Sequence, residues 1–360
     1  MVYIILVFLV SFLLCMIIIR LGVFSDAPLG VQKFHKKPTP RAGGLGVFLG
    51  LLGAGVGFWV AKKDFAWEYF LFLVTCLPVF FAGILEDATK RVSPKLRLVA
   101  GFLSGLLAVL LLNAGVKRVN LPFFDQLLSY WVFSLIFSAF AFSGVSHAFN
   151  IIDGFNGLLG GVAIIVFGSY AYVSFLHGDL FLTYLSLSFV FAVLGFMLWN
   201  YPFGLVFLGD GGAYLLGFGA SVLGALLTSR HPDVSPWFAL LLVLYPVWET
   251  LFSVYRKKFL RGTSPMEPDG LHFHMLVYKR IVRFFIGERA EALKRNSYTS
   301  PFLWFMEVLC AVPAVLFWNN TSLLMLFSFA FVVFYTWLYL RIVRFKVPGV
   351  FKAPQRGQKL

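Results

Sequence analysis

The sequence predicts an all-α polytopic membrane protein, and three observations lead to this fold class. Hydrophobic residues make up 60% of the 360 residues and charged residues only 13%, whereas a soluble globular chain has about 45–50% apolar and about 25% charged residues. The mean hydropathy is +0.86. The apolar residues form long continuous runs instead of the short alternating segments of a membrane β-barrel. Disorder, a coiled coil and a water-soluble enzyme are therefore excluded.

Eleven apolar runs are candidates for membrane-spanning helices, because crossing about 30 Å of hydrocarbon takes about 20 mostly apolar residues. The fifth and sixth runs are separated by a polar, glycine-rich interruption at 144–161. The first run has no basic segment before it and no small-residue cleavage site after it, so we expect a retained helix and not a signal peptide. In order, the runs are 2–20, 45–61, 68–85, 98–114, 127–146, 158–176, 181–199, 212–229, 236–255, 301–318 and 322–340.

The basic residues predict the orientation of these spans. With alternate loops assigned to opposite sides, 25 of the 30 Lys and Arg residues lie on one side, ten of them in the loop 256–300. Basic loops face the cytoplasm, so the N-terminus is expected outside and the C-terminus inside. Their short blocks between apolar spans make them topology signals and argue against nucleic-acid binding. We expect one membrane domain over 1–340 and a basic cytoplasmic tail over 341–360.

Scarce acidic residues gather at the predicted cytoplasmic ends of the spans. Each of them, taken alone, could be an ordinary helix cap. As a set they indicate one site, because ionisable groups at the membrane boundary are costly and usually functional. The acidic members are Glu86, Asp87, Asp153 and Asp210, and the polar residues near them are Asn150, Asn156, Asn200, His272 and His274.

Two of the four segments that carry this chemistry lie early in the chain. The segment 32–45 is a cationic loop that contains Lys37 and Arg41 and ends in a Gly-Gly pair. It could approach a bound anion, or it could simply be a loop that obeys the charge bias. In 83–97 the adjacent Glu86 and Asp87 are followed by four cations, which suits a hard metal ion or a phosphate-binding mouth.

The other two segments lie in the middle of the chain. Asn150, Asp153 and Asn156 are spaced three apart, so they would share one face if the segment is helical. Asp210, between glycines at a helix start, can hold Mg²⁺ through one carboxylate. From spacing alone, Phe207 is more often lipid-facing than ligand-stacking.

The late histidines do not indicate zinc. His272 and His274 are separated by one residue, and the chain has neither a His-Glu-x-x-His motif nor a cysteine cluster, which zinc sites of the common types require. The three cysteines lie inside apolar runs and are expected to be inert packing residues.

Together the four segments resemble the polyprenyl-phosphate N-acetylhexosamine-1-phosphate transferases, a glycosyltransferase family 4 group with MraY and WecA branches. The resemblance spans about residues 20–300. Its motifs are Pro-x-Pro-Arg-x-Gly-Gly at 38–44, the acidic pair at 86–87, Asn-x-x-Asp-Gly-x-Asn-Gly-Leu at 150–158, Phe-Leu-Gly-Asp-Gly-Gly-Ala at 207–213 and the histidine loop at 269–274. The Pro-Arg motif and the eleven spans look more like the WecA branch. The chain departs from the family pattern at Glu86, usually Asp, and at Asn156, often Asp.

The resemblance implies a reaction and its participants. An N-acetylhexosamine-1-phosphate, GlcNAc-1-phosphate by default, would pass from a UDP-sugar to undecaprenyl phosphate with release of UMP and with Mg²⁺, which Mn²⁺ could replace. This would start a lipid-linked glycan of the bacterial cell envelope, such as a cell-wall or O-antigen polymer, at the inner membrane. Other UDP-N-acetyl sugars, of the FucNAc, QuiNAc or MurNAc-pentapeptide type, are alternatives, and a homodimer is an open possibility.

The resemblance also implies roles for the site residues. Asp210 would be the main Mg²⁺ ligand, and Asn150 could contact the metal or the diphosphate. Asp153, Asn156 and Asn200 would form the nucleotide pocket, with Phe207 stacked on uracil. Glu86 and Asp87 would face the lipid phosphate. Lys37, Arg41, His272 and His274 would bind diphosphate or sugar. We group Glu86, Asp87 and Asp153 as the predicted catalytic residues.

Two other classes of protein compete with this interpretation. A secondary transporter for anionic solutes would place charges near the bilayer midplane and repeat one half of the chain. Here the acidic groups lie at one face and no repeat is visible. A non-catalytic lipid-binding scaffold would explain the basic loops but not the clustered carboxylates and asparagines.

Overall fold

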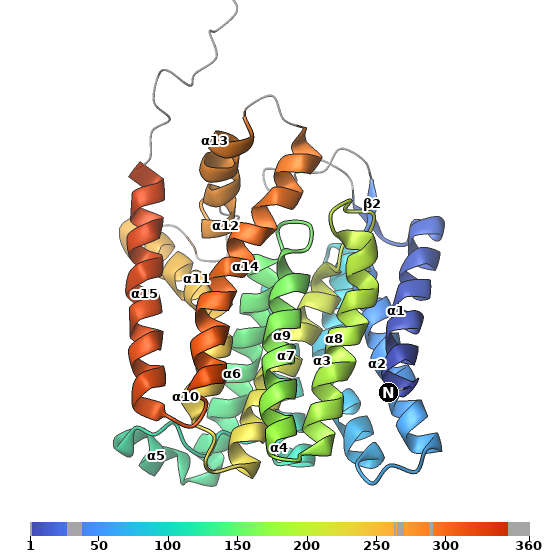
Figure 1. Ribbon diagram of the computed structural model, residues 1–360, viewed down its shortest axis with the longest axis vertical. Helices are drawn as coiled ribbons and strands as arrows, with labels where there is room; N and C mark the ends of the chain where they lie inside the picture. Colours follow the sequence, from blue (N-terminus) through green and yellow to red (C-terminus); the bar gives the residue numbers. More distant parts are fainter. Residues whose placement is uncertain (1, 27–37, 263, 265–269, 288–290, 345–360) are drawn as a thin grey trace, which may run out of the picture.

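The chain folds into a bundle of helices that run along one long axis, as the computed structural model shows for residues 2–26, 38–262, 264, 270–287 and 291–344 (Figure 1). Ten of the helices in this described part are long and apolar enough to cross a membrane, which confirms the predicted fold class. They are α1 (Val2–Leu21), α2 (Gly43–Val60), α3 (Ala66–Thr89), α4 (Pro94–Leu112), α6 (Trp131–Ile152), α7 (Leu158–Leu176), α8 (Leu180–Asn200), α9 (Gly209–Arg230), α14 (Ala292–Leu316) and α15 (Thr321–Arg344).

The ninth span is broken, and here the prediction of one continuous helix over 236–255 was wrong. Two helices, α10 (Pro236–Leu242) and α11 (Leu244–Tyr255), meet at an angle of 68°. Pro246 explains the break, because a proline has no backbone N–H and its ring clashes with the carbonyl four residues earlier. A π-helical turn, Arg256–Leu260, continues α11.

The fifth span also begins later than its apolar run suggests. A separate short helix, α5 (Pro122–Leu128), lies at the lower end of the bundle in Figure 1. Tyr130 then adopts an extended conformation, with φ −76° and ψ 114°, and α6 starts at the next residue. The predicted start at residue 127 was therefore wrong.

Short elements cover the opposite end of the bundle. The strands β1 (Ser25–Asp26) and β2 (Thr39–Pro40) pair antiparallel and tie the end of α1 to the start of α2. The helices α12 (Phe273–Leu276) and α13 (Arg283–Ile286) lie at the same upper end, joined by a π-helical turn over 277–282 (Figure 1).

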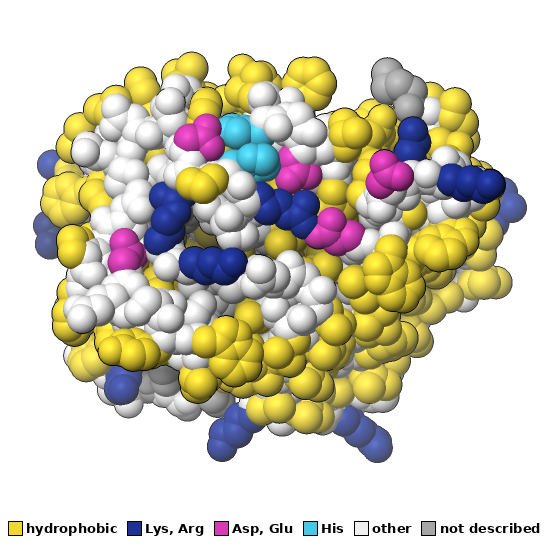
Figure 2. Space-filling view, turned by 90° about the horizontal axis from the view of Figure 1, so that it is seen from below, with side chains coloured by type: hydrophobic (Ala, Val, Ile, Leu, Met, Phe, Trp, Pro, Cys, Tyr) yellow, Lys and Arg dark blue, Asp and Glu magenta, His cyan; other side chains and the backbone are white. Residues whose placement is uncertain are grey.

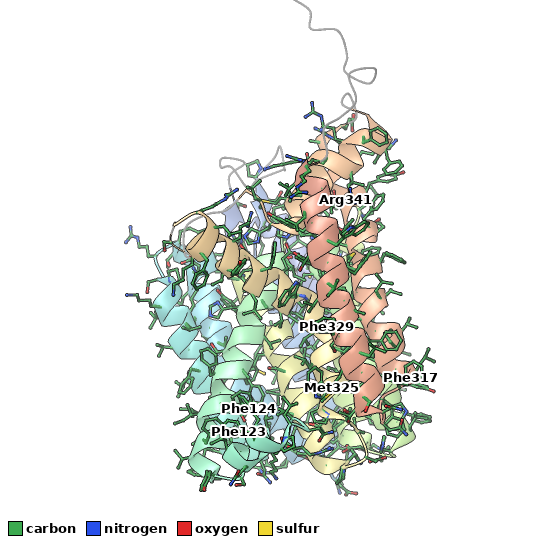
Figure 3. The ribbon with its side chains drawn as sticks, turned by 90° about the vertical axis from the view of Figure 1, so that its left-hand side faces the viewer. Phe123, Phe124, Phe317, Met325, Phe329 and Arg341 are labelled. Atoms are coloured by element: carbon green, nitrogen blue, oxygen red, sulfur yellow. The ribbon has the colours of Figure 1, made fainter. Side chains whose placement is uncertain are left out.

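The helix α9 forms the centre of the bundle. It is buried along nearly its whole length and packs against α2, α3, α6 and α7. At the periphery, α15 carries apolar side chains on its outward face, among them Met325 and Phe329, with Arg341 toward its end (Figure 3). Phe329 is 68% exposed, as expected of a side chain that faces lipid.

The two ends of the described chain lie at opposite ends of the bundle. α1 begins near the lower end and α15 finishes at the upper end (Figure 1), as an odd number of crossings requires. Which end faces the cytoplasm stays a prediction, as does the division into a domain over 1–340 and a tail over 341–360. Residues 345–360 lie outside the described part.

Candidate active site

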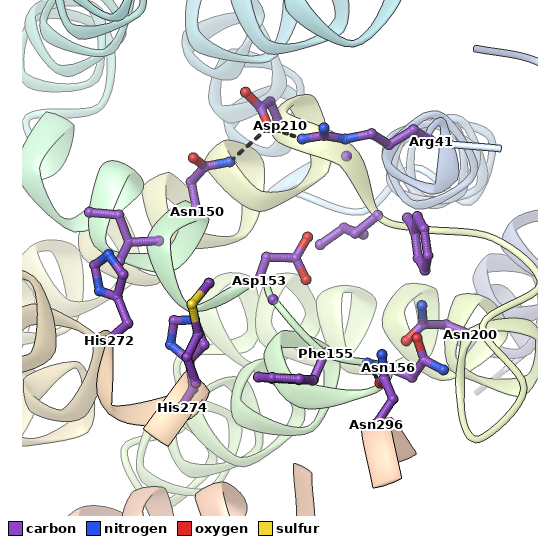
Figure 4. A pocket seen from close by; sticks show the side chains of 16 residues that line it. Arg41, Asn150, Asp153, Phe155, Asn156, Asn200, Asp210, His272, His274 and Asn296 are labelled. Atoms are coloured by element: carbon purple, nitrogen blue, oxygen red, sulfur yellow. Dashed lines mark hydrogen bonds and ion pairs between the residues drawn. The ribbon is translucent and has the colours of Figure 1, made fainter. Parts of the chain in front are cut away.

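A polar cavity of about 360 Å³ opens at the upper end of the bundle. It lies among the start of α9, the end of α6, the loop after α6, and α12 (Figure 4). Among its lining residues are nine of those predicted from the sequence: Arg41, Asn150, Asp153, Asn156, Asn200, Phe207, Asp210, His272 and His274. Segments that are far apart in the chain thus meet at one place, as the sequence predicted. Lys37 lies outside the described residues.

Asp210 stands at the first turn of α9 and is the most heavily engaged acidic group of the cavity. Arg41 and Arg97 each form an ion pair with its carboxylate. The amide of Asn150 donates a hydrogen bond of 3.1 Å to Asp210 Oδ1 (Figure 4). Two guanidinium groups therefore lie beside one buried carboxylate, so groups of both charges are present at this corner of the cavity.

Asp87 holds the start of α9 in place. Its buried carboxylate accepts the backbone N–H of Asp210 at 2.9 Å and of Gly211 at 3.0 Å, and Arg41 Nε lies 3.2 Å from Oδ1. Gly209, just before, has φ +81°, a conformation that favours glycine. A Cβ there would lie 2.5 Å from Asp87 Oδ2. The geometry thus gives Asp87 a positioning contact with α9.

The acidic pair does not line the cavity. Glu86 is half-buried and accepts the backbone N–H of Val92 at 2.8 Å, while Asp87 is covered by α9. Neither carboxylate therefore lines the cavity. Their catalytic role facing a lipid phosphate stays a prediction.

The Gly-Gly pair brings α2 against α9. The N–H of Gly43 donates to Phe207 O at 2.9 Å, and the N–H of Gly44 donates to Leu208 O at 2.8 Å. A Cβ on Gly44 would lie 2.5 Å from the Cα of Gly212, so only glycine fits. The pair thus serves helix packing, where the sequence had suggested approach to a bound anion.

Asp153 is the acidic group whose proton affinity the cavity changes most clearly. It follows the last residue of α6 and is half-buried, and Figure 4 shows it in the middle of the cavity. Burial raises the pKa of its carboxyl to about 7, and the nearby Asp210 adds to the rise while Arg41 opposes it. A carboxyl near neutrality can gain or lose a proton in the working range of the cell.

Asn150, Asp153 and Asn156 were expected to share one face only if their segment is helical, and the helix ends before Asp153. Asp153, with φ −74° and ψ 59°, leaves the helical conformation, so Asn156 lies in a loop. That loop is fixed through its own backbone and side chain: the N–H of Asn156 donates to Asn296 Oδ1 at 2.8 Å, and its Nδ2 donates to Pro202 O at 3.1 Å.

Asn200 joins this network from the end of α8. Its Oδ1 accepts the N–H of Gly157 at 2.6 Å, and its Nδ2 donates to Val206 O at 2.7 Å. The asparagines therefore form a frame that connects α8, α14 and the loop after α6. Phe207, half-buried, is part of the cavity wall beside them, so it is not wholly directed at lipid.

Sequence reasoning missed three residues of the site. Arg97 was one of the four cations that suited a metal or phosphate site, but it was not singled out as a site residue, although it pairs with Asp210. Asn296 carried no motif. Glu249 lies inside a span, buried among apolar groups, yet its Oε1 is 2.6 Å from His274 Nδ1. A lone acidic residue inside an apolar run was the one available signal for Glu249.

Oxygen donors for a hard cation are present at Asp210 and Asn150. Among the described residues, no group of three or more His, Cys, Asp or Glu side chains is arranged to hold a metal ion. Mg²⁺ usually binds through one or two carboxylates and takes the rest of its shell from water and substrate phosphate.

Comparison with known proteins agrees with the resemblance. The glycosyl transferase family 4 model matches residues 69–228. A probable undecaprenyl-phosphate N-acetylglucosaminyl 1-phosphate transferase of Bacillus subtilis is 28% identical over 308 residues, covering 81% of this chain and 81% of that protein. The undecaprenyl-phosphate alpha-N-acetylglucosaminyl 1-phosphate transferase of Thermotoga maritima is 29% identical over 298 residues, covering 80% of this chain and 87% of that protein.

The fold and the cavity, with these relatives, define an integral-membrane glycosyl-phosphate transferase. The chain is similar to glycosyl transferase family 4 over residues 69–228, a little under half of its length. It is a multi-pass membrane protein, as its sequence predicted.

Proposed function

We propose that this protein transfers an N-acetylhexosamine-1-phosphate, with GlcNAc-1-phosphate as the default, from a UDP-sugar to undecaprenyl phosphate and releases UMP. The reaction would start a lipid-linked envelope glycan at the cytoplasmic face of a bacterial inner membrane. The names of the relatives support the lipid and the sugar. The observation that carries the proposal is the cavity at one end of the bundle, where two arginines converge on Asp210.

The charges of the cavity suit two anionic substrates. A diphosphate donor and a phosphate lipid repel each other, and preorganised cations offset such repulsion. Arg41 and Arg97 are held beside Asp210, and the two histidines line another wall. We assign Arg41, Arg97, His272 and His274 to the diphosphate or sugar.

The same corner supports Mg²⁺ as cofactor, with Mn²⁺ as a substitute. Asp210 would hold the ion through its carboxylate and Asn150 through its amide oxygen, while substrate phosphates and water complete the shell. Their side chains are already in contact, at 3.1 Å between Asn150 Nδ2 and Asp210 Oδ1. When bound, the ion supplies Lewis-acid stabilisation of the phosphate charge.

The nucleotide would lie toward Phe207. Its half-buried ring in the cavity wall offers a stacking face for uracil, and an aromatic stack of this kind adds about 0.5–1.5 kcal/mol. Asp153 and Asn156 line the floor beside it. Since Asn200 and Asn156 use their side chains to fix the loop, we assign them the shape of the pocket, and Asp153 the contact with the nucleotide.

For the mechanism we favour direct displacement. An oxygen of the lipid phosphate would bond to the sugar-bearing phosphorus, and the bond from that phosphorus to the bridging oxygen would break, so that UMP leaves with the electron pair. A phosphate monoester has a second pKa of about 6, so the nucleophile is already a dianion at neutral pH and needs little help from a base.

Isotope exchange separates this route from an aspartyl-phosphate-type enzyme intermediate. Labelled UMP is incubated with the UDP-sugar after all lipid acceptor has been removed. Direct displacement forbids label transfer into the UDP-sugar. Exchange at a rate comparable to turnover would establish the covalent route.

The donor is identified by a panel of UDP-sugars. Purified protein, undecaprenyl phosphate and Mg²⁺ are incubated with UDP-GlcNAc, a UDP-FucNAc or UDP-QuiNAc type donor and UDP-MurNAc-pentapeptide, and UMP is measured. We expect the highest kcat/KM with UDP-GlcNAc. No UMP from any donor would refute the proposed function, and a clear preference for another donor would correct only the sugar.

A further inference from the structure

The wall of the cavity that carries the two histidines is supported by a carboxylate from inside the membrane-spanning bundle. Glu249 lies on α11, and both its side chain and that of His274 are only 1% exposed. Glu249 Oε1 lies 2.6 Å from His274 Nδ1 and accepts the backbone N–H of the same residue at 3.3 Å. The second carboxylate oxygen, Oε2, has no hydrogen-bond partner among the described residues.

These contacts define which ring nitrogen carries hydrogen. An ionised carboxylate can only accept, so the short contact of Glu249 Oε1 to the ring places a hydrogen on Nδ1. The other ring nitrogen, Nε2, is left for the cavity, which His274 lines. A carboxylate on Nδ1 also stabilises the positive ring that forms when Nε2 carries hydrogen too.

The surroundings hold the ring in this direction. His272 stacks on His274, with ring centroids 5.3 Å apart and an interplanar angle of 11°. The rings of Phe155 and His274 pack edge to face, with centroids 5.8 Å apart. A Cβ on Gly154 would lie 3.0 Å from His274 Nε2, so the missing side chain leaves that nitrogen its space.

The break in the ninth span brings the carboxylate to this position. After the bend of 68° that precedes α11, α11 packs against α6. The last residues of α6 and the loop after it line the cavity. Glu249 is in the second turn of the new helix, so the bend places it under α12, the helix that begins next to His272.

We propose that Glu249 is a positioning residue that fixes His274 with hydrogen on Nδ1, so that Nε2 meets the anionic diphosphate or the sugar of the donor. This rests on the proposed function for the identity of the ligand, whereas the Glu249–His274 contact stands independently of it. His274 touches the substrate, and Glu249 acts through it.

The test replaces Glu249 by Gln, which keeps the shape and removes the charge. We expect the KM for the UDP-sugar to rise about 10- to 150-fold, the range for a lost hydrogen bond to a charged group. kcat should change less, because binding is weakened in the ground state as well. Glu249→Asp, which keeps the charge, should recover part of the loss. Unchanged KM in a folded Glu249→Gln protein would overturn the proposal.

A carboxylate–histidine pair at the other end of the molecule provides the matched control. Figure 2 views that end, where histidine side chains lie together among acidic and basic ones. His231 Nε2 lies 3.2 Å from Asp179 Oδ2. Asp179→Asn should leave the KM for the UDP-sugar within twofold of the wild type. A rise equal to that in Glu249→Gln would overturn the proposal, since any lost pair would then have the same effect.

A spectroscopic measurement covers the case in which Glu249→Gln does not fold. Protein with ¹⁵N-labelled histidine is examined without substrate, and the His274 signals are assigned by their loss in His274→Gln. We expect a protonated Nδ1 in the wild type, and a shift of hydrogen from Nδ1 to Nε2 if Glu249→Gln is folded. A wild-type Nδ1 without hydrogen would overturn the inference. If the wild type instead releases no UMP, the proposed function fails and this spectrum still tests the pair.

Discussion

Replacing Asp87 by Asn tests whether this carboxylate acts by holding the start of α9. It accepts two backbone N–H groups, of Asp210 at 2.9 Å and of Gly211 at 3.0 Å. The single amide oxygen of Asn can accept one of them well and would present an NH₂ group to the other. The variant therefore loses at least one hydrogen bond to a charged group and the ion pair with Arg41.

The size of the effect follows from these contacts. A hydrogen bond to a charged group contributes about 1.5–3 kcal/mol, and each 1.4 kcal/mol is about a factor of ten. If the lost hydrogen-bond energy displaces Asp210 from its catalytic position, kcat/KM should fall about 10- to 150-fold. Half-saturation by Mg²⁺ should move to a higher concentration, because Asp210 is the residue that is displaced.

The assay is UMP release at limiting UDP-sugar over a series of Mg²⁺ concentrations, with Asp125→Asn as control. Asp125 Oδ1 accepts the N–H of Val119 at 2.6 Å near α5, away from the cavity, and its replacement should leave kcat/KM unchanged. Activity of Asp87→Asn within threefold of the wild type would refute the positioning role. A fall above about 10⁴-fold with unchanged Mg²⁺ dependence would instead point to direct general acid–base catalysis.

Three further predictions concern packing, pH and orientation. Gly44→Ala should lower both the melting temperature and UMP release, since its Cβ would lie 2.5 Å from Gly212 Cα; a wild-type melting curve would contradict the close approach of α2 and α9. Burial raises the pKa of Asp153 from 3.8 to about 7, so the ligand-free folded protein binds this proton more tightly than the unfolded chain does. The folded protein therefore loses stability as the pH rises from about 3.8 to about 7. The loss is on the order of 1 kcal/mol after screening by solvent. The melting temperature of Asp153→Asn minus that of the wild type should therefore be larger at pH 8.5 than at pH 5.5. An equal difference at both pH values would contradict the pKa shift. A cysteine at Arg261 should resist a membrane-impermeant label in intact cells while one at Asp64 reacts, since the native cysteines are buried; the reverse pattern would invert the orientation.

Much of the site was visible in the sequence because polar residues are rare in this chain. Asp210, Asn150 and Arg41 stood out at the ends of apolar runs, and the charge bias alone predicted that they share one end of the bundle. The spans themselves followed from length and apolarity, since a bilayer imposes a minimum length on each helix.

The features of the site that could not be predicted from the sequence depend on tertiary contacts. The pairing of Arg97 with Asp210 joins residues 113 positions apart, and nothing local distinguishes Arg97 from the other cations of its segment. The hydrogen bonds that Asp87 accepts from the start of α9 likewise join distant segments of the chain. The bend before α11, by contrast, had a local signal in Pro246, which interrupts helical hydrogen bonding.

We propose that sugar-1-phosphate transfer takes place in the cavity around Asp210. The most direct measurement follows UMP and lipid-linked sugar together, with purified protein, undecaprenyl phosphate, UDP-GlcNAc and Mg²⁺, in the wild type and in a folded Asp210→Asn variant. We predict one UMP per lipid-linked product in the wild type and neither product above background in the variant. Transfer by Asp210→Asn at the wild-type rate and at the same Mg²⁺ concentration would contradict the account.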